Sequence, residues 1–426
     1  MSEIPLPDNQ VSLRALRGLL AQRSVLTALE VFHAELGDVF GIPLPGFNPV
    51  MMVGPEANRF VLVEGRADLR WRAERDPITR LLRHGVLVED GDTHDQLRHQ
   101  LNPALHKRML GSYVDQMWQC TDTVTKDWGV TPVDMLVEMR KVALLILTKT
   151  LFNVDVEPEL RRLWDAILRM LAYISPGPWL IWPGIPRIGY QRALSTVDRY
   201  LYEIIRLRRA MPGDDMLGLL IASGMPDELI RDQLLTMLIA GHDTSTALLS
   251  WALYVLSSRP DIQAKARAEI DATLGGNPPD YAGIGRLPYL EQVINETLRM
   301  YPPIHLGSRI AARDLEFKDY HIPAGRRVLY SIYLVHRDPR YWNNPGEFMP
   351  ERFASEQPRQ PYTFLPFGGG ARNCIGLAFA QVEAKVVLAR ILQRYDLAIT
   401  SQRVGLRMGA TLEPRPGVPV MVQKRF

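Results

Sequence analysis

Cysteine is scarce in this chain, because only Cys120 and Cys374 occur among 426 residues. Two cysteines cannot form a disulfide framework, so the composition favours a reducing compartment, and we expect the cytoplasm. No further cysteine or histidine lies at short spacing from Cys374, which excludes a zinc site at that position.

Long apolar runs, charge imbalance and linker-like segments are also missing. No stretch approaches about 20 consecutive apolar residues and the N-terminus lacks a signal-like pattern, so we expect neither a membrane anchor nor secretion. Fifty basic and 47 acidic residues give a net charge of +3, which does not indicate a nucleic-acid partner. Without a repeat or low-complexity tract, residues 1–426 are expected to form one domain. From the short stretch after the helix that follows Cys374, we expect no fused reductase.

The stretch Phe364–Gly376 surrounds Cys374 with glycine. Gly368–Gly370 and Gly376 remove side chains from the backbone near one sulfur, so a large flat partner could approach it closely. The segment Leu377–Tyr395 then has apolar residues near helical spacing, which places the sulfur before a helix.

The position before a helix favours a thiolate, because free N–H groups and the helix dipole stabilise negative charge. Arg372 adds a positive charge two residues away. Such a thiolate suits an axial ligand to haem iron. A phosphate loop would need Gly-Lys-Ser/Thr at the start of the helix, and none follows. A buried inert thiol and a catalytic thiol nucleophile stay open on the residues alone.

The segment Phe367–Gly376 resembles the haem-binding signature of the cytochrome P-450 superfamily, Phe-x-x-Gly-x-Arg-x-Cys-x-Gly, at every fixed position. The resemblance implies haem b with Cys374 as the iron ligand. It also implies the fold of the soluble bacterial members, a mainly α, triangular single domain with a long central helix over the haem and a small β-rich part. Further cofactor contacts implied within the signature are Phe367, Gly368, Arg372 and Gly376.

Hydrophobic periodicity predicts the elements that surround this loop. The longest helical pattern runs from about Pro226 to Ser258, which at ~1.5 Å per residue spans roughly 50 Å. Strand-like runs occur at about 36–63 and about 305–335, the clearest being Arg327–Val335, and could pair into one small sheet. Nearly everything else is predicted to be helical.

The middle of the long helix contains Ala240–Thr246, where glycine, aspartate and hydroxyl residues interrupt apolar sequence. These residues are mediocre helix formers. Their hydroxyls could simply bond back to i−4 carbonyls and bend the helix. The segment also resembles the family motif Ala/Gly-Gly-x-Asp/Glu-Thr-Thr/Ser. That resemblance implies that Thr244 hydrogen-bonds oxygen at the iron, that Asp243 helps to deliver protons, and that Ala240 and Gly241 adjoin the cofactor.

Haem carries two propionates, which need cationic donors when they are partly buried. His94 and Arg98 lie one helical turn apart and resemble the His-x-x-x-Arg of many soluble members. Arg309 and Arg372 complete the expected set. Solvated surface charge is the alternative for each of them taken singly.

Glu296 and Arg299 are spaced to meet on one helix face, a weak signal by itself. With Arg352 of Pro-Glu-Arg-Phe they resemble the family's Glu-x-x-Arg pairing, which implies a buried triad with a structural role. His305 could contact substrate or serve the fold. The loop Pro176–Pro186 could be a lid, a membrane-touching patch or simple packing, and we favour the lid.

These observations together predict a haem-thiolate monooxygenase that inserts one atom of O2 into a small apolar substrate. Two electrons would come from a separate ferredoxin- or flavodoxin-type donor. The alternatives are a peroxide-driven peroxygenase and a non-enzymatic haem-thiolate sensor. Lys107 and Arg108 are the expected docking charges for an acidic donor.

Overall fold

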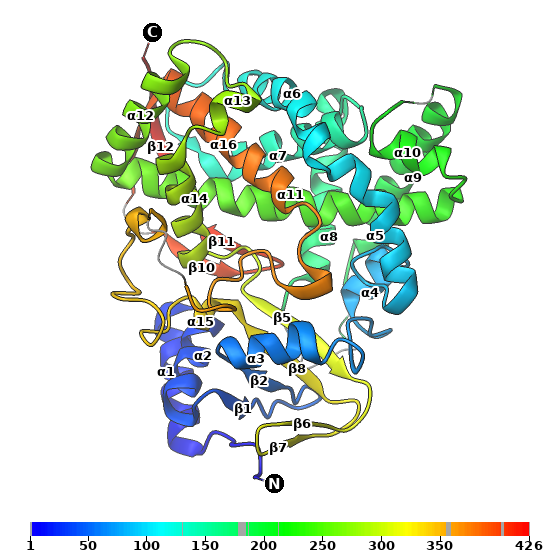
Figure 1. The fold of residues 1–426 in the computed structure, drawn as a ribbon, viewed down its shortest axis with the longest axis vertical. Helices are drawn as coiled ribbons and strands as arrows, with labels where there is room; N and C mark the ends of the chain where they lie inside the picture. The colour runs from blue at the N-terminus through cyan, green and yellow to red at the C-terminus, as the bar shows by residue number, and fades with distance from the viewer. Residues whose placement is uncertain are drawn as a thin grey trace.

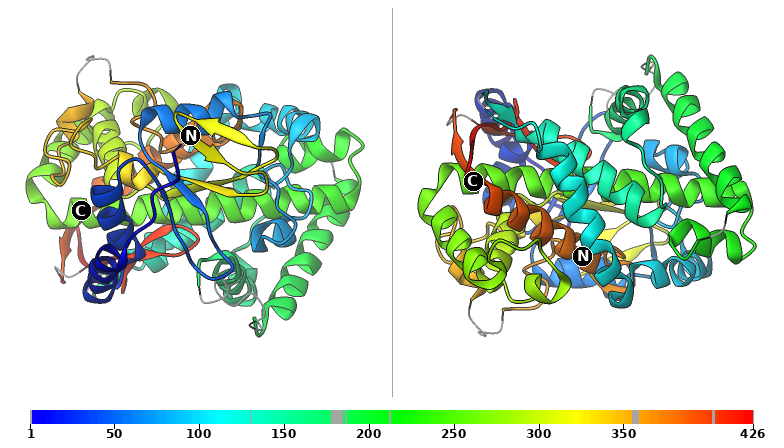
Figure 2. Two further views of the ribbon diagram at one scale, coloured as in Figure 1. Left: turned by 90° about the horizontal axis from the view of Figure 1, so that it is seen from below. Right: turned by 90° about the horizontal axis from the view of Figure 1, so that it is seen from above.

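A long helix crosses the whole molecule and separates a large helical part from a smaller part that contains a sheet (Figure 1). This helix, α11, runs from Asp227 to Ser258, and its 32 residues span about 48 Å at ~1.5 Å per residue. Figure 2 shows it from below and from above, where it again runs across the molecule. The predicted bounds are confirmed. The computed structural model describes residues 2–129, 131–177, 185, 187–211, 213–354, 359–401 and 404–425.

Helices make up most of the described chain. In chain order they are α1 (Asn9–Gln22), α2 (Val25–Leu36), α3 (Pro55–Arg59), α4 (Pro77–Leu82), α5 (Gly91–Leu105), α6 (Lys107–Thr125), α7 (Met135–Leu151), α8 (Leu160–Ile174), α9 (Tyr190–Ala210), α10 (Met216–Ala222), α11, α12 (Pro260–Leu274), α13 (Tyr281–Ile284), α14 (Pro288–Met300), α15 (Ile332–Val335) and α16 (Leu377–Arg394). The predicted helices before Pro302 and after Cys374 correspond to α14 and α16 and are confirmed.

The main sheet has five strands in the order β1-β2-β8-β5-β3, namely β1 (Val39–Gly41), β2 (Val50–Met52), β8 (Arg327–Ser331), β5 (Leu306–Ala311) and β3 (Leu69–Arg70). Strand β2 pairs in parallel with β8, with Val50 opposite Val328. The two strand-rich regions, far apart in sequence, therefore share one sheet, as predicted. Strands β6 (Leu315–Phe317) and β7 (Tyr320–Ile322) form a separate hairpin.

Both predicted strand regions extend beyond the strands that the structure contains. After β2 the chain forms α3 and then a π-helix, η1 (Phe60–Glu64), because Gly54 turns the backbone at φ 100° and Pro55 occupies the first helical position. Strand β8 ends at Ser331, whose hydroxyl accepts a hydrogen bond from Leu334 N at 3.1 Å and caps α15.

The prediction that nearly everything else is helical was wrong for the C-terminal residues. Four strands follow α16: β9 (Tyr395–Ile399), β10 (Gly405–Met408), β11 (Leu412–Arg415) and β12 (Pro419–Lys424). Strands β10 and β11 form a hairpin, while β12 lies between β9 and the short β4 (Val133–Asp134). In β12, Val420 and Val422 are buried and Met421 is exposed, which is the alternation of a half-buried strand.

The buried core falls into a large cluster among the helices and two smaller clusters around the main sheet. None of the described helices combines the length and apolar composition that a bilayer crossing needs. Of the loop Pro176–Pro186, only Pro176, Gly177 and Ile185 are among the described residues, so the predicted lid lies largely outside them.

Candidate functional site

The loop that carries Cys374 lies between a short 3-10 helix, η5 (Gly370–Arg372), and the start of α16. Cys374 N donates to Phe367 O at 2.8 Å, which closes the loop around the glycine run. Phe367 packs against the large core and anchors the loop. Cys374 itself is exposed. The predicted position of the sulfur, just before a helix, is confirmed.

Two glycines of this loop adopt left-handed backbone conformations, Gly368 at φ 69° and Gly370 at φ 65°. Gly370 also lies directly against η1, since a Cβ built on it would be 2.2 Å from Leu62 O. At Gly368 nothing lies within 4 Å of that position. Glycine therefore serves two purposes in this loop: it allows a tight turn, and it allows close contact between the loop and η1.

The thiol of Cys374 is not a ready-made thiolate in the protein alone. Cys374 is exposed as a residue, but the protein atoms around its sulfur exclude water and raise the pKa of the thiol. This effect outweighs the Gly376 N–H and the positive charge of Arg98, which lower the pKa. The N–H group at the helix start does favour the thiolate, as predicted, but in the protein alone its effect is smaller than that of burial. Coordination to a metal would remove the thiol proton, because a metal-bound thiol is deprotonated outright.

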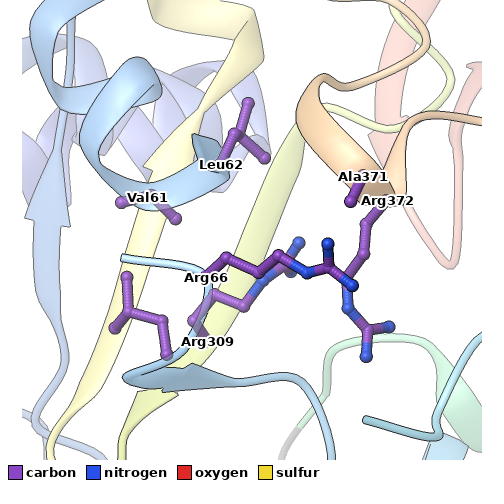
Figure 3. Close-up of a pocket in the computed structure, with 7 residues that line it drawn as sticks. Val61, Leu62, Arg66, Arg309, Ala371 and Arg372 are labelled. Carbon is purple, nitrogen blue, oxygen red and sulfur yellow. The ribbon is translucent and has the colours of Figure 1, made fainter. Parts of the chain in front are cut away.

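Three guanidinium groups meet in a small pocket beside this loop (Figure 3). Arg309 comes from β5, Arg372 from η5, and Arg66 from the chain just after η1. The pKa of Arg372 is lowered to about 10, mainly by burial and also by Arg309 and Arg66, while Asp90 acts in the opposite direction. Arg372 is held by Asp90 at 2.5 Å. Sequence reasoning identified Arg309 and Arg372 but missed Arg66, which carries no recognisable pattern.

The two predicted donors on α5 face different partners. His94 is buried, and its Nδ1 lies 2.8 Å from Asp95 Oδ1. Burial lowers the pKa of His94, while Asp95 raises it. Arg98 donates to Asn373 O at 2.8 Å and to Asn373 Oδ1 at 2.7 Å, so two hydrogen bonds join it to the residue before Cys374. The structure thus brings α5 against the thiol loop.

Helix α11 stays α-helical through Ala240–Thr246. Thr244 Oγ1 donates to Ala240 O at 2.6 Å, the backbone bond that the plainer interpretation expected. This leaves the lone pairs of Oγ1 to accept a hydrogen bond. A Cβ on Gly241 would lie 2.5 Å from Leu147 Cδ1, so that glycine allows α7 to approach closely.

A buried hydrogen bond joins α11 to α16. Ser245 Oγ donates to Glu383 Oε2 at 2.5 Å. Ser245 directly follows Thr244, and Glu383 lies nine residues after Cys374. Burial raises the pKa of Glu383 to about 8, so its carboxyl is largely protonated at neutral pH. Sequence reasoning missed Glu383, although a glutamate inside an apolar helical pattern was the available signal. The helix with Asp243 and Thr244 is therefore fixed relative to the thiol loop.

The predicted structural triad is present. Glu296 of α14 accepts from Arg299 Nε at 2.7 Å and from Arg352 Nε at 3.0 Å. Glu296 and Arg299 are completely buried. Of the remaining candidates, His305 is buried and its pKa is lowered to about 4 by burial, so it is neutral near physiological pH.

The donors present fit a flat group that carries iron and two carboxylates. One sulfur is exposed at the loop, where it can reach a metal, while the residues lining the neighbouring pocket include three arginines and no carboxylate. Arg372 pairs with Asp90 and Arg66 with Asp95. Guanidinium groups that converge in this way can in addition donate to an anion with several oxygens. The chemistry of this set matches haem bound through a thiolate.

Comparison with known proteins agrees with this reading. The family model for Cytochrome P450 matches residues 13–415. A Mycobacterium bovis protein whose name places it among the cytochromes P450 is 30% identical over 419 residues, which cover 93% of this chain and 97% of the relative.

Two further relatives have names that state an activity. Cyclooctatin synthase of Streptomyces melanosporofaciens is 29% identical over 404 residues, covering 90% of this chain and 86% of its own. Cytokinin hydroxylase of Arabidopsis thaliana is 31% identical over 396 residues, covering 85% and 75%. The family match over almost the whole length, together with the exposed thiol and its arginines, leads to one conclusion: the chain belongs to the cytochrome P450 family and is a haem monooxygenase.

Proposed function

We propose that the chain holds haem b through Cys374 and inserts one atom of O2 into a small apolar organic substrate. Haem, when bound, supplies the oxidising chemistry. Cys374 would supply the thiolate, and four cationic or imidazole side chains would hold the propionates, namely His94, Arg98, Arg309 and Arg372. Residues 1–426 would act as one catalytic domain.

The observation that carries this proposal is the fixed relation between the thiol loop and the acid–alcohol pair. Asp243 and Thr244 lie on α11 beside Ser245, which bonds to Glu383 of the helix that begins after Cys374. Thr244 would accept a hydrogen bond from the pocket side, and Asp243 would supply protons. On the same helix, Ala240 and Gly241 offer no charge to a substrate, in keeping with an apolar one. The acid–alcohol pair argues against a peroxide-driven enzyme, which needs no proton supply to activate O2.

Thr244→Ala tests the proposal. We expect haem binding to be retained, while most reducing equivalents appear as peroxide or water instead of product. The reason is that a positioned proton-transfer group contributes about 10²–10⁴-fold to its step. The measurement is the ratio of product, and of peroxide, to the NAD(P)H consumed.

Two matched variants make that test specific. Thr244→Ser keeps a hydroxyl at the same position and should retain most of the coupling. Thr246→Ala removes a hydroxyl of the same helix, one that bonds to His242 O at 2.8 Å, and should also stay coupled. Unchanged product per NAD(P)H in Thr244→Ala would remove Thr244 from the mechanism.

An acidic ferredoxin- or flavodoxin-type donor is the proposed source of electrons. Lys107 and Arg108 are exposed at the start of α6, directly after α5, and no ion pair joins them to another described residue. Two cations of α16 are paired with carboxylates, Lys385 with Glu291 at 2.6 Å and Arg390 with Asp122 at 2.7 Å.

Reversing both charges, in Lys107→Glu/Arg108→Glu, should slow reduction by an acidic donor by about tenfold at low ionic strength and less at high ionic strength. Stopped-flow reduction across a salt titration measures this. Arg17→Glu/Arg23→Glu on and just after α1, at the far side of the molecule in Figure 1, makes the same charge change and should leave reduction unaltered. Equal rates for the two double variants would place docking elsewhere.

A further inference from the structure

The acid on α11 is held by a residue from the far end of the chain. Asp243 is 2% exposed, and its Oδ2 accepts a hydrogen bond from Thr411 Oγ1 at 2.8 Å. Thr411 is equally buried and lies in the turn between β10 and β11. Within the described part of the chain, the other oxygen, Oδ1, has no hydrogen-bond partner. The hairpin therefore occupies one oxygen of this acid and leaves the second one available.

A buried ion pair lies close to the same carboxyl. Glu413 of β11 bonds to Arg140 of α7, and both side chains are largely buried. Arg407 lies opposite Glu413 in the β10–β11 register and is more exposed than Glu413 and Arg140. His242 Nε2 lies 3.1 Å from Arg140 O, and burial lowers the pKa of this imidazole to about 4, so it carries no charge. Asp243 is thus surrounded by one negative and two positive groups.

These surroundings bring the pKa of the Asp243 carboxyl close to neutral pH. The pKa of Asp243 is raised to about 6, mainly by burial and also by repulsion from Glu413. The Thr411 hydroxyl, Arg140 and Arg407 act against this rise, because each stabilises the charged form. The carboxyl therefore titrates close to neutral pH, which suits a proton donor that must also be reloaded.

We propose that Thr411 and the Arg140–Glu413 ion pair position Asp243 as the proton donor of the proposed reaction. Thr411 fixes Oδ2, so the O–H bond that breaks is at Oδ1, and each proton lost from Asp243 is replaced by one from solvent. The C-terminal hairpin thereby belongs to the proton supply. This inference rests on the proposed function, because it assigns a support to the proposed acid.

The test compares Thr411→Val, which removes the hydroxyl at similar volume, with Thr411→Ser, which keeps it. The titration midpoint of Asp243 is read in the haem-loaded protein from the pH-dependent infrared band of its protonated carboxyl. The Asp243→Asn spectrum identifies that band and separates it from the band of Glu383. Loss of a hydrogen bond to the charged form should raise the midpoint in Thr411→Val by about half to one pH unit, and Thr411→Ser should match wild type.

Glu413→Gln should shift the titration midpoint of Asp243 in the opposite direction. Removing a nearby negative charge makes ionisation of Asp243 easier, so the midpoint should fall. If Glu413→Gln does not fold, the double variant Arg140→Gln/Glu413→Gln replaces it, because it leaves no single buried charge. The two Thr411 variants test the role of Thr411 without either of these Glu413 variants. The pH profile of peroxide released per NAD(P)H should move in the same direction as the midpoint in each variant. A merely structural role for Thr411 would change unfolding but not these midpoints.

The inference is overturned if Thr411→Val and Thr411→Ser share one midpoint and one pH profile. Failure of the proposed function has a different signature, because a wild-type protein whose reduced carbon-monoxide complex lacks the thiolate-type band would refute haem-thiolate ligation whatever the midpoints are.

Discussion

Cys374→Ser and Cys374→His are expected to abolish the red-shifted Soret band that a thiolate gives the reduced carbon-monoxide complex, whereas Cys120→Ser keeps it. Cys374 is exposed at a loop flanked by cationic groups, where a metal can reach its sulfur. Cys120 lies in α6, partly buried among core residues, and burial raises the pKa of its thiol to about 12. Cys374 is therefore the iron ligand that we expect. Carbon-monoxide difference spectra of the three purified variants measure the effect.

Histidine is the informative replacement, because it can still coordinate iron and so separates loss of thiolate from loss of haem. Haem content, determined on the same samples, provides the control. If Cys120→Ser loses the band while Cys374→Ser retains it, the central assignment of this site is wrong.

The sequence predicted those parts of the fold that depend on local signals. Helix α11 could be bounded because Pro226 caps its start and Pro260 follows its end. The thiol loop could be placed because a glycine run around one cysteine before a helical pattern is rare. The shared sheet followed from two separate strand-rich regions that needed partners, whereas the parallel pairing of β2 with β8 is known only from the structure.

What the sequence did not predict depends on contacts between distant segments. Thr411 bonds to Asp243 across 168 residues, and no local pattern around Thr411 indicates an acid beside it. Arg66 reaches the pocket of Arg309 only because η1 packs against the thiol loop. The short strand β9 was missed because it directly continues α16, whose helical periodicity masked the change. Tertiary packing decided each of these features.

Glu296→Gln is expected to destabilise the fold more than any change of one surface charge. Glu296 is completely buried, and its two oxygens accept from Arg299, from Arg352 and from Met349 N at 2.9 Å. A neutral amide of the same shape leaves two guanidinium groups without their counter-charge. Removing one partner of a buried ion pair costs about 3–5 kcal/mol. Total stabilities are about 5–15 kcal/mol, so this loss should be evident in denaturant unfolding followed by circular dichroism.

The loss should also reach the thiol loop, because the triad connects α14 to the segment that leads there. Arg299 donates to His336 O at 2.8 Å, and His336 Nε2 accepts from Leu365 N at 2.8 Å, shortly before the glycine run. Haem retention should therefore fall together with the unfolding midpoint. Glu351→Gln is the matched control, since Glu351 pairs with Lys265 at 2.7 Å where both side chains are more than half exposed. Such a pair contributes less than about 1 kcal/mol. Equal unfolding midpoints for the two variants would mean that the triad, although buried, does not hold this part of the fold together.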